Sequence, residues 1–208
     1  MKFFKQLLAG LTMLCATQAF AGVELGKDYK LLNPAQPVAS GKKIEVLEFF
    51  AYPCGHCFHL APLLAAWEAK APNDVQFSYV PVIFRDSWTL MAQTFYALEA
   101  LGQHKKLHDE LFKAWHVTNT DLSDEAKVTA YVAQRGVDRA KFSAALHSFA
   151  VQSKVNRSVQ MLEGYQIRGT PTLVVDGKYA ITGLGPEETI RALNGVIELA
   201  RKDRGGKR

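Results

Sequence analysis

Hydrophobic positions in the first third of the chain follow strand and helix patterns in turn. The mostly apolar run from Ile44 to Phe50 predicts a strand that is buried on both faces of a sheet. Apolar residues at helical spacing follow between Phe58 and Lys70, where Pro62 interrupts the helix interior. The run from Val75 to Val82 predicts the next strand. This order indicates a strand, helix and strand unit at the start of the fold.

From Arg85 to about Tyr165 the pattern is helical throughout. The block has its own apolar periodicity, which predicts a helical subdomain with its own core. Ser123 and Asp138 are predicted helix N-caps, and glycines follow two of the segments as C-terminal stops. The predicted segments are Trp88 to Leu101, His104 to Trp115, Asp124 to Arg135 and Arg139 to Gly164, the last with room for a break near Ala150.

Strand patterns return near the C-terminus. Leu173 to Val175 and Lys178 to Ile181 predict two strands joined by a hairpin turn at Asp176-Gly177. Glu187 to Arg201 has the pattern of a final helix, and a short edge strand is expected at Tyr29 to Leu32. Because strands lie on both sides of the helical block, we predict an α/β fold with an inserted all-helical subdomain. The expected boundaries are residues 22–84 and 166–208 for the two parts of the sheet domain, and 85–165 for the insertion.

The first 21 residues have the pattern of a cleavable secretory signal. Two lysines give a charged start, a short apolar core follows, and Ala19-Phe20-Ala21 is a small-x-small cleavage site. The apolar core is too short to span a bilayer. Removal of residues 1–21 would also remove Cys15, which leaves Cys54 and Cys57 as the only cysteines of the mature chain.

The formal net charge of +5 does not indicate a basic binding surface. Lysines of the signal and the basic end of the chain, Arg201 to Arg208, account for it, and the body between them is close to neutral. Nucleic-acid binding is therefore not expected. The basic end is predicted to be a frayed, solvated tail.

The candidate chemistry lies in Cys54-Gly55-His56-Cys57, at the junction of the first predicted strand and the helix. Two cysteines separated by two residues form a dithiol that can close into a disulfide. At the first turn of a helix, unpaired backbone N–H groups and the helix dipole favour the charged form of a thiol. We therefore predict that Cys54 is the nucleophile and that Cys57 is the buried resolving cysteine.

The neighbours of the dithiol indicate how its reactivity is set. Lowering a thiol pKa by about three units requires roughly 4 kcal/mol, whereas a helix terminus supplies at most ~2 kcal/mol. Direct N–H hydrogen bonds and His56, through its charge or a hydrogen bond, are expected to supply the rest. Glu48 shares one face of its strand with Val46 and Phe50, so it is either a buried carboxylate that relays protons or tunes the thiols, or an edge-facing residue. A stabilised thiolate would make the disulfide an oxidant.

Together these motifs resemble the thioredoxin superfamily, and most closely the DsbA family of bacterial periplasmic thiol oxidases. The resemblance rests on Val46 to Phe50 leading into Cys54-Gly55-His56-Cys57, on Pro62, and on Gly169-Thr170-Pro171 before an apolar strand, and it extends over nearly the whole mature chain. It implies a thioredoxin fold with a helical insertion and Cys54 as the nucleophile. It also implies a cis-proline at Pro171, whose preceding residue, Thr170, pairs its backbone with bound substrate.

The resemblance further implies a compartment and partners. The protein would be a periplasmic monomer that needs neither cofactor nor metal and donates the Cys54–Cys57 disulfide to unfolded exported proteins with free cysteines, through a mixed disulfide at Cys54. A quinone-linked thiol oxidase of the membrane, similar to DsbB, would reoxidise it. The best-known members carry Pro-His between the cysteines, whereas this chain carries Gly55-His56, and no lysine in Val75 to Val82 matches the usual partner of the buried acid. Both departures leave the strength of the oxidant open.

Three alternatives use the same cysteines. A periplasmic reductase or disulfide isomerase would keep Cys54 and Cys57 reduced. A soft-metal site could combine them with His59, although no second CxxC completes it. A plain structural disulfide would constrain little chain entropy in so short a loop. The redox state of the pair in the cell separates an oxidase from a reductase or isomerase.

Overall fold

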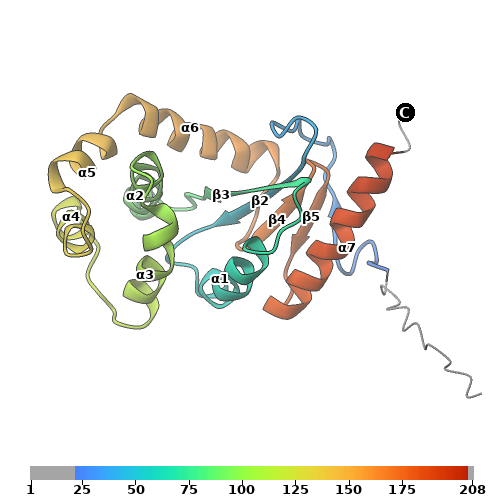
Figure 1. The fold of residues 1–208 in the computed structure, drawn as a ribbon, viewed down its shortest axis with the longest axis horizontal. Coiled ribbons are helices and arrows are strands. Elements are labelled where there is room, and N and C mark those ends of the chain that lie inside the picture. The colour runs from blue at the N-terminus through green and yellow to red at the C-terminus, as the bar shows by residue number, and fades with distance from the viewer. Residues whose placement is uncertain (1–21, 206–208) are drawn as a thin grey trace, which may run out of the picture.

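The structure is a computed structural model that describes residues 22–205 (Figure 1). The expected signal, residues 1–21, and the last three residues, 206–208, lie outside the described residues. A mixed sheet forms the centre of the molecule, and helices pack on both of its faces.

Five strands make up the sheet. They are β1 (Lys30–Leu31), β2 (Ile44–Phe50), β3 (Val75–Pro81), β4 (Thr172–Val175) and β5 (Tyr179–Thr182). Their spatial order is β1-β5-β4-β2-β3, with β2 parallel to β3 and every other pair antiparallel. All seven residues of β2 are buried, which confirms the strand predicted from its continuous apolar run.

The helices form two groups. They are α1 (Gly55–Glu68), the short 3₁₀ helix η1 (Asp86–Trp88), α2 (Thr89–Ala100), α3 (His104–His116), α4 (Glu125–Ala133), α5 (Arg139–Leu146), α6 (Phe149–Gly164) and α7 (Pro186–Gly205). Residues of α1 and α7 pack on one face of the sheet, and the C-terminal end of α6 packs on the other. Figure 1 places α2 to α5 beside the sheet, where they enclose a second core that extends to the end of β2. The helices between β3 and β4 confirm the predicted α/β fold with a helical insertion.

The hairpin between β4 and β5 turns at Asp176 and Gly177, as predicted. Both residues have positive φ, 54° and 64°, the backbone that a two-residue type I′ turn requires. A side chain at Gly177 would also collide with the carbonyl oxygen of Gln36. Glycine at this position therefore satisfies both the turn geometry and a close approach of the backbone.

Capping side chains define the ends of the inserted helices. Asp138 accepts a hydrogen bond from the Lys141 N–H at 2.8 Å, which confirms it as the N-cap of α5. The predicted cap Ser123 is wrong, because Asp124 takes this role for α4 and accepts from the Lys127 N–H at 2.9 Å. The long segment predicted after Arg139 divides into α5 and α6, close to the expected break.

The C-terminal helix α7 is longer than predicted. It continues past Arg201 to Gly205, so the prediction of a frayed, solvated tail is wrong for residues 201–205. Arg201 bonds both carboxylate oxygens of Asp74, and Arg204 bonds Asp176 and the carbonyl oxygens of Gly41 and Lys42. The basic residues thus attach the helix to loops of the sheet domain. In the described part of the chain, neither α7 nor any other helix is long and apolar enough to cross a membrane.

Candidate active site

Cys54 lies where the turn after β2 meets α1. It is the N-cap residue of the helix, with an extended backbone, and its sulfur accepts a hydrogen bond from the Cys57 N–H at 3.2 Å. An N-cap side chain ordinarily accepts from these first N–H groups through oxygen, and here a sulfur takes that position. Cys54 is half-buried, whereas Cys57, inside the first turn, is fully buried, so the two thiols differ in access as predicted.

The surroundings of Cys54 favour its thiolate. A hydrogen bond from the Cys57 thiol has the largest effect, and the Thr170 side chain and the backbone N–H groups of Cys57 and His56 add to it. Partial burial opposes these donors, but together they lower the pKa of Cys54 to about 5. At neutral pH the more accessible sulfur therefore carries a negative charge.

Cys57 has the opposite acidity. Burial raises the pKa of its thiol, and the hydrogen bond to Cys54 and the nearby carboxyl of Glu48 raise it further. Cys57 therefore remains a thiol over the physiological pH range. The pair combines one reactive thiolate with one protonated, shielded partner.

The loop before β4 completes the site from the far end of the chain. The sulfur of Cys54 lies 3.3 Å from the carbonyl oxygen of Thr170, to which the protonated thiol can donate. The peptide bond between Thr170 and Pro171 is cis, as the resemblance implied. The Thr172 hydroxyl donates to the Gly169 carbonyl at 2.8 Å and holds the two ends of this loop together. Folding thus brings Thr170 and Pro171 to the dithiol.

Glu48 is buried beneath the dithiol. It is 2% exposed, and its neighbours on the adjacent strands are Tyr79 and Leu173. Burial raises its pKa to about 8, and the negative charges of Cys54 and Glu68 contribute. Of the two readings of Glu48, the buried carboxylate is the one found in the structure.

A tyrosine stands opposite Glu48 on β3, where no lysine was found in the sequence. The Tyr79 hydroxyl donates to Glu68 at 3.4 Å, and Lys105 of α3 binds the other oxygen of Glu68 at 3.0 Å. The cation in this set of contacts is therefore Lys105, which belongs to the helical insertion. A search for a lysine along the strand could not have found it.

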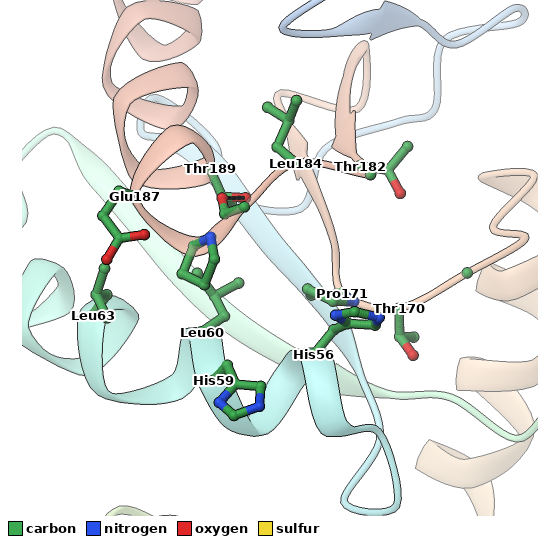
Figure 2. Close-up of a pocket in the computed structure, with 14 residues that line it drawn as sticks. His56, His59, Leu60, Leu63, Thr170, Pro171, Thr182, Leu184, Glu187 and Thr189 are labelled. Atoms are coloured by element: carbon green, nitrogen blue, oxygen red, sulfur yellow. Dashed lines mark hydrogen bonds between the residues drawn. The ribbon is translucent and has the colours of Figure 1, made fainter.

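A hollow of about 840 Å³ opens beside the dithiol (Figure 2). Its walls come from three places: one face of α1, the Thr170–Pro171 loop, and the loop that leads from β5 into α7. The labelled residues in Figure 2 include His56, His59, Leu60, Leu63, Thr170, Pro171, Leu184 and Glu187. The mixture of apolar walls, exposed backbone and a few polar side chains suits an extended polypeptide.

His56 projects into this hollow and is exposed. Its backbone N–H helps to lower the pKa of Cys54, whereas its imidazole makes none of the hydrogen bonds found in residues 22–205. A direct electrostatic effect of the imidazole on Cys54 stays a prediction. The same part of the chain contains no group of three or more His, Cys, Asp or Glu side chains that could hold a metal ion.

Sequence analysis missed the side chains of α3 that contact the turn before Cys54. His108 and His116 both bond Tyr52, one through the phenol and the other through the backbone carbonyl. Only their spacing of two helical turns, which places both on one face of a helix, could have suggested a shared role.

The dithiol at a helix N-terminus and the cis-proline loop match known proteins. A family model described as a DSBA-like thioredoxin domain matches residues 45–193. The chain belongs to the DsbA family.

Similarity to DsbA proteins extends over most of the chain. It is 35% identical to the thiol:disulfide interchange protein DsbA of Pseudomonas aeruginosa over 179 residues, which cover 85% of each chain. It is 36% identical to the DsbA of Azotobacter vinelandii over 203 residues, 94% of this chain and 95% of that one. The crystal structure of Pseudomonas aeruginosa DsbA superimposes with a TM-score of 0.84 at 34% identity and covers 88% of this chain and 97% of its own.

Membership in the DsbA family confirms the resemblance and the thioredoxin-like fold. It also identifies the activity class, because DsbA proteins are thiol:disulfide oxidoreductases. In this member, Cys54 and Cys57 are the only cysteines in the described residues. Their use as the redox pair of this reaction stays a prediction.

Proposed function

We propose that this protein donates a Cys54–Cys57 disulfide to exported proteins that carry free cysteines, in the periplasm. The observation that supports this most is the contrast between the two thiols: the pKa of half-buried Cys54 is lowered to about 5, while that of buried Cys57 is raised. A stabilised thiolate lowers the free energy of the reduced protein relative to its disulfide. The disulfide is then a good oxidant.

The transfer would proceed in two exchanges. A substrate thiolate attacks the Cys54 sulfur, the Cys54–Cys57 bond breaks, and Cys57 leaves with the electron pair. A second substrate thiolate attacks the substrate sulfur of the mixed disulfide, and Cys54 leaves as the stabilised thiolate. The substrate loses two electrons and two protons, and this protein ends as the dithiol. Attack is directed to Cys54 because Cys57 is fully buried.

Thr170 and Pro171 are proposed to bind the substrate chain. The Thr170 backbone is adjacent to Cys54, and the hollow beside it is lined by α1 on one side and by the loop into α7 on the other. An extended segment in this hollow could pair its backbone with Thr170, in the manner of an added strand. This placement would bring the substrate cysteine to the Cys54 sulfur.

Glu48 and His56 are proposed to assist. Glu48 has its pKa raised to about 8 and acts electrostatically on Cys57, so it can give a proton to the Cys57 thiolate when that sulfur leaves. His56 would favour the Cys54 thiolate through positive charge or through a hydrogen bond from its imidazole. Both residues would thus act on the thiolates that form during the exchange, Glu48 on that of Cys57 and His56 on that of Cys54.

Turnover requires that the dithiol be oxidised again. A quinone-linked membrane oxidase similar to DsbB would take the two electrons, and the exported location of such an enzyme agrees with the signal predicted at residues 1–21. The helical insertion, residues 85–165, and the sheet domain, residues 22–84 and 166–208, would act together as one monomer.

Trapping of mixed disulfides tests the proposal. In cells that make the Cys57→Ala protein, the Cys54 thiolate can attack a disulfide of an exported protein, one sulfur of which leaves as a thiolate. Non-reducing gels should show the resulting adducts, because the Cys57 thiol that could reverse them is absent. The adducts should disappear in Cys54→Ser and after reduction. If no variant gives an adduct that depends on Cys54, the proposed oxidase function is wrong.

The redox state of the unmodified protein provides the second readout. Alkylation of free thiols in whole cells should find Cys54 and Cys57 mainly in the disulfide form. A mainly reduced pair would instead support a periplasmic reductase or isomerase that uses the same dithiol.

A further inference from the structure

Three aromatic residues of α3 form one face directed at the active-site turn. His108, Phe112 and His116 are spaced by four residues, so they lie above one another on the helix. The Phe112 ring packs against Tyr52, with ring centroids 5.0 Å apart, and Tyr52 lies two residues before Cys54. The inserted subdomain therefore contacts the turn that leads to the nucleophile.

His108 holds the side chain of Tyr52. Its Nδ1 lies 3.1 Å from the Tyr52 hydroxyl, and both residues are buried. Burial lowers the pKa of His108 to about 3, so its ring is neutral at physiological pH. A neutral imidazole and a phenol can share one hydrogen between them, which satisfies both polar groups inside an aromatic core.

His116 holds the backbone at the same position. Its Nε2 lies 2.8 Å from the Tyr52 carbonyl oxygen. A carbonyl oxygen can only accept, so Nε2 carries the hydrogen and donates it. The ring also stacks on Phe58, with centroids 5.0 Å apart and an interplanar angle of 23°. One side chain therefore touches the residues on both flanks of the Cys54–Cys57 segment.

The groups that stabilise the thiolate depend on how this turn meets the helix. The Cys54 N–H donates to the Ala51 carbonyl at 3.0 Å, so the Ala51–Cys54 turn sets where the sulfur lies. The Cys57 N–H must reach that sulfur from the first turn of α1. A hydrogen bond weakens steeply with distance and angle, so a small rotation of the turn would weaken it.

We propose that His116 is a positioning residue, which holds the Ala51–Cys54 turn against the first turn of α1 through its bond to Tyr52 and its stacking on Phe58. It acts through these two residues and makes no described contact with the Cys54 sulfur. This inference rests on the proposed use of Cys54 as the nucleophile. It assigns the helical insertion a part in setting the reactivity of the dithiol.

Three substitutions separate the hydrogen bond from the packing. His116→Gln keeps an N–H donor for the Tyr52 carbonyl, His116→Phe keeps an aromatic ring on Phe58 without the donor, and His116→Ala removes both. His147→Ala is the matched control, because His147 is an exposed histidine of the same subdomain that bonds Glu125. If His116→Ala does not fold, the Gln and Phe variants still decide the question.

The readouts are the Cys54 pKa, from thiolate absorbance, and the equilibrium of the pair with glutathione. We expect His116→Phe and His116→Ala to raise the Cys54 pKa by about half a unit to one unit, which makes the disulfide roughly three- to tenfold less oxidising. His116→Gln, which keeps the donor but loses the ring, should raise the Cys54 pKa less than His116→Phe does, and His147→Ala should match the parent protein.

Two results would overturn the inference. One is that His116→Phe leaves the Cys54 pKa unchanged. The other is that the Cys54 pKa in His116→Gln is as high as it is in His116→Phe. The parent protein is measured first, and a Cys54 pKa near that of an ordinary thiol there would instead contradict the proposed function. Failure of the inference and failure of the function therefore give different results.

Discussion

Cys54 and Cys57 have opposite acidities although one helical turn separates them. At Cys54 several donors face one half-buried sulfur, and at Cys57 burial and a nearby carboxyl act against the charge. Neither effect belongs to cysteine itself. The reactivity of the site is therefore a property of the groups that the fold places around each sulfur.

The contribution of His56 can be measured against that of its neighbour His59. We expect His56→Ala to raise the Cys54 pKa by less than one unit, because the backbone N–H groups of His56 and Cys57 stay in place. His59→Ala, which removes another exposed histidine of α1, should have a smaller effect. Thiolate absorbance titrations of both variants provide the comparison. Equal shifts in the two variants would assign no special effect to the His56 imidazole.

Replacement of Glu48 by glutamine should change how stability depends on pH. Its folded pKa of about 8 lies above the ordinary value of 4.5 for a glutamate side chain, so its contribution to stability is complete below pH 4.5 and is lost as pH rises through 8. Glu48→Gln does not titrate. Near pH 4.5 the variant and the parent should have the same free energy of unfolding. Above pH 8 the free energy of unfolding of the variant should be higher by roughly a few kcal/mol.

Denaturant melts of the reduced proteins at several pH values measure this difference. Glu163→Gln, a change at an exposed position on α6, is the control and should follow the parent at every pH. A constant offset between Glu48→Gln and the parent from pH 4.5 to 8 would contradict a raised pKa.

The sequence predicted the reactive residues but not all of their surroundings. Cys54, Cys57 and the Thr170–Pro171 loop follow from motifs whose spacing carries chemical meaning. Burial of Glu48 stayed open, because alternation along a strand gives the face of a residue but not what covers that face. The contacts of His116 involve an element far along the chain, and local patterns contain no information about such pairs.

At the level of elements, continuous apolar runs were the most reliable guide. The strand β2 has the predicted ends. Gly102, which follows α2, and Gly136, which follows α4, have the positive φ expected of helix stops. The extent of α7 was not predicted, because Lys202, Asp203 and Arg204 are typical of a solvated end. Arg204 bonds the Asp176 carboxylate and the Lys42 carbonyl, and Asp203 accepts a hydrogen bond from the Tyr179 hydroxyl, so distant segments hold these two residues in the helix.

The bonds of Arg204 lead to a prediction about α7. Its guanidinium binds Asp176 in the β4–β5 turn, where the carboxylate is 15% exposed, and it also reaches the carbonyls of Gly41 and Lys42. Arg204→Ala would leave that partly buried carboxylate without its cation and should lower the unfolding free energy by about 1–3 kcal/mol. Thermal and denaturant unfolding measure the loss.

Lys202→Ala is the matched control, because Lys202 is an exposed basic residue of the same turn of α7. Its effect should stay within about 0.5 kcal/mol. If both substitutions lowered the unfolding free energy equally, the end of α7 would behave as a solvated tail.

For the whole molecule, reduction and stability should be linked through pH. The folded pKa of Cys54, about 5, lies below the ordinary value of 9.0 for a cysteine thiol, so its contribution to stability is complete above pH 9 and is lost as pH falls through 5. The disulfide form has no such group, whereas Glu48 titrates in both forms and largely cancels. The stability of the reduced form relative to the oxidised form should therefore increase between pH 5 and 9.

The expected slope is about 1 kcal/mol per pH unit, since solvent reaches the half-buried Cys54 sulfur and screens part of the effect. Paired denaturant melts of the two redox forms at pH 5, 6.5 and 8 measure it. A difference that does not change with pH, with the oxidised form several kcal/mol more stable throughout, would indicate a structural disulfide instead.

The sheet order also determines when the site can exist during synthesis. β2 carries the chain to Cys54, but its neighbour β4 begins only at Thr172, so the helical insertion must be made before the two strands can meet. At 5–20 residues per second, this delay is about 6 to 24 s. Until then the Cys54 thiol has no Thr170 beside it, and the loop proposed to bind substrate is missing from the growing chain.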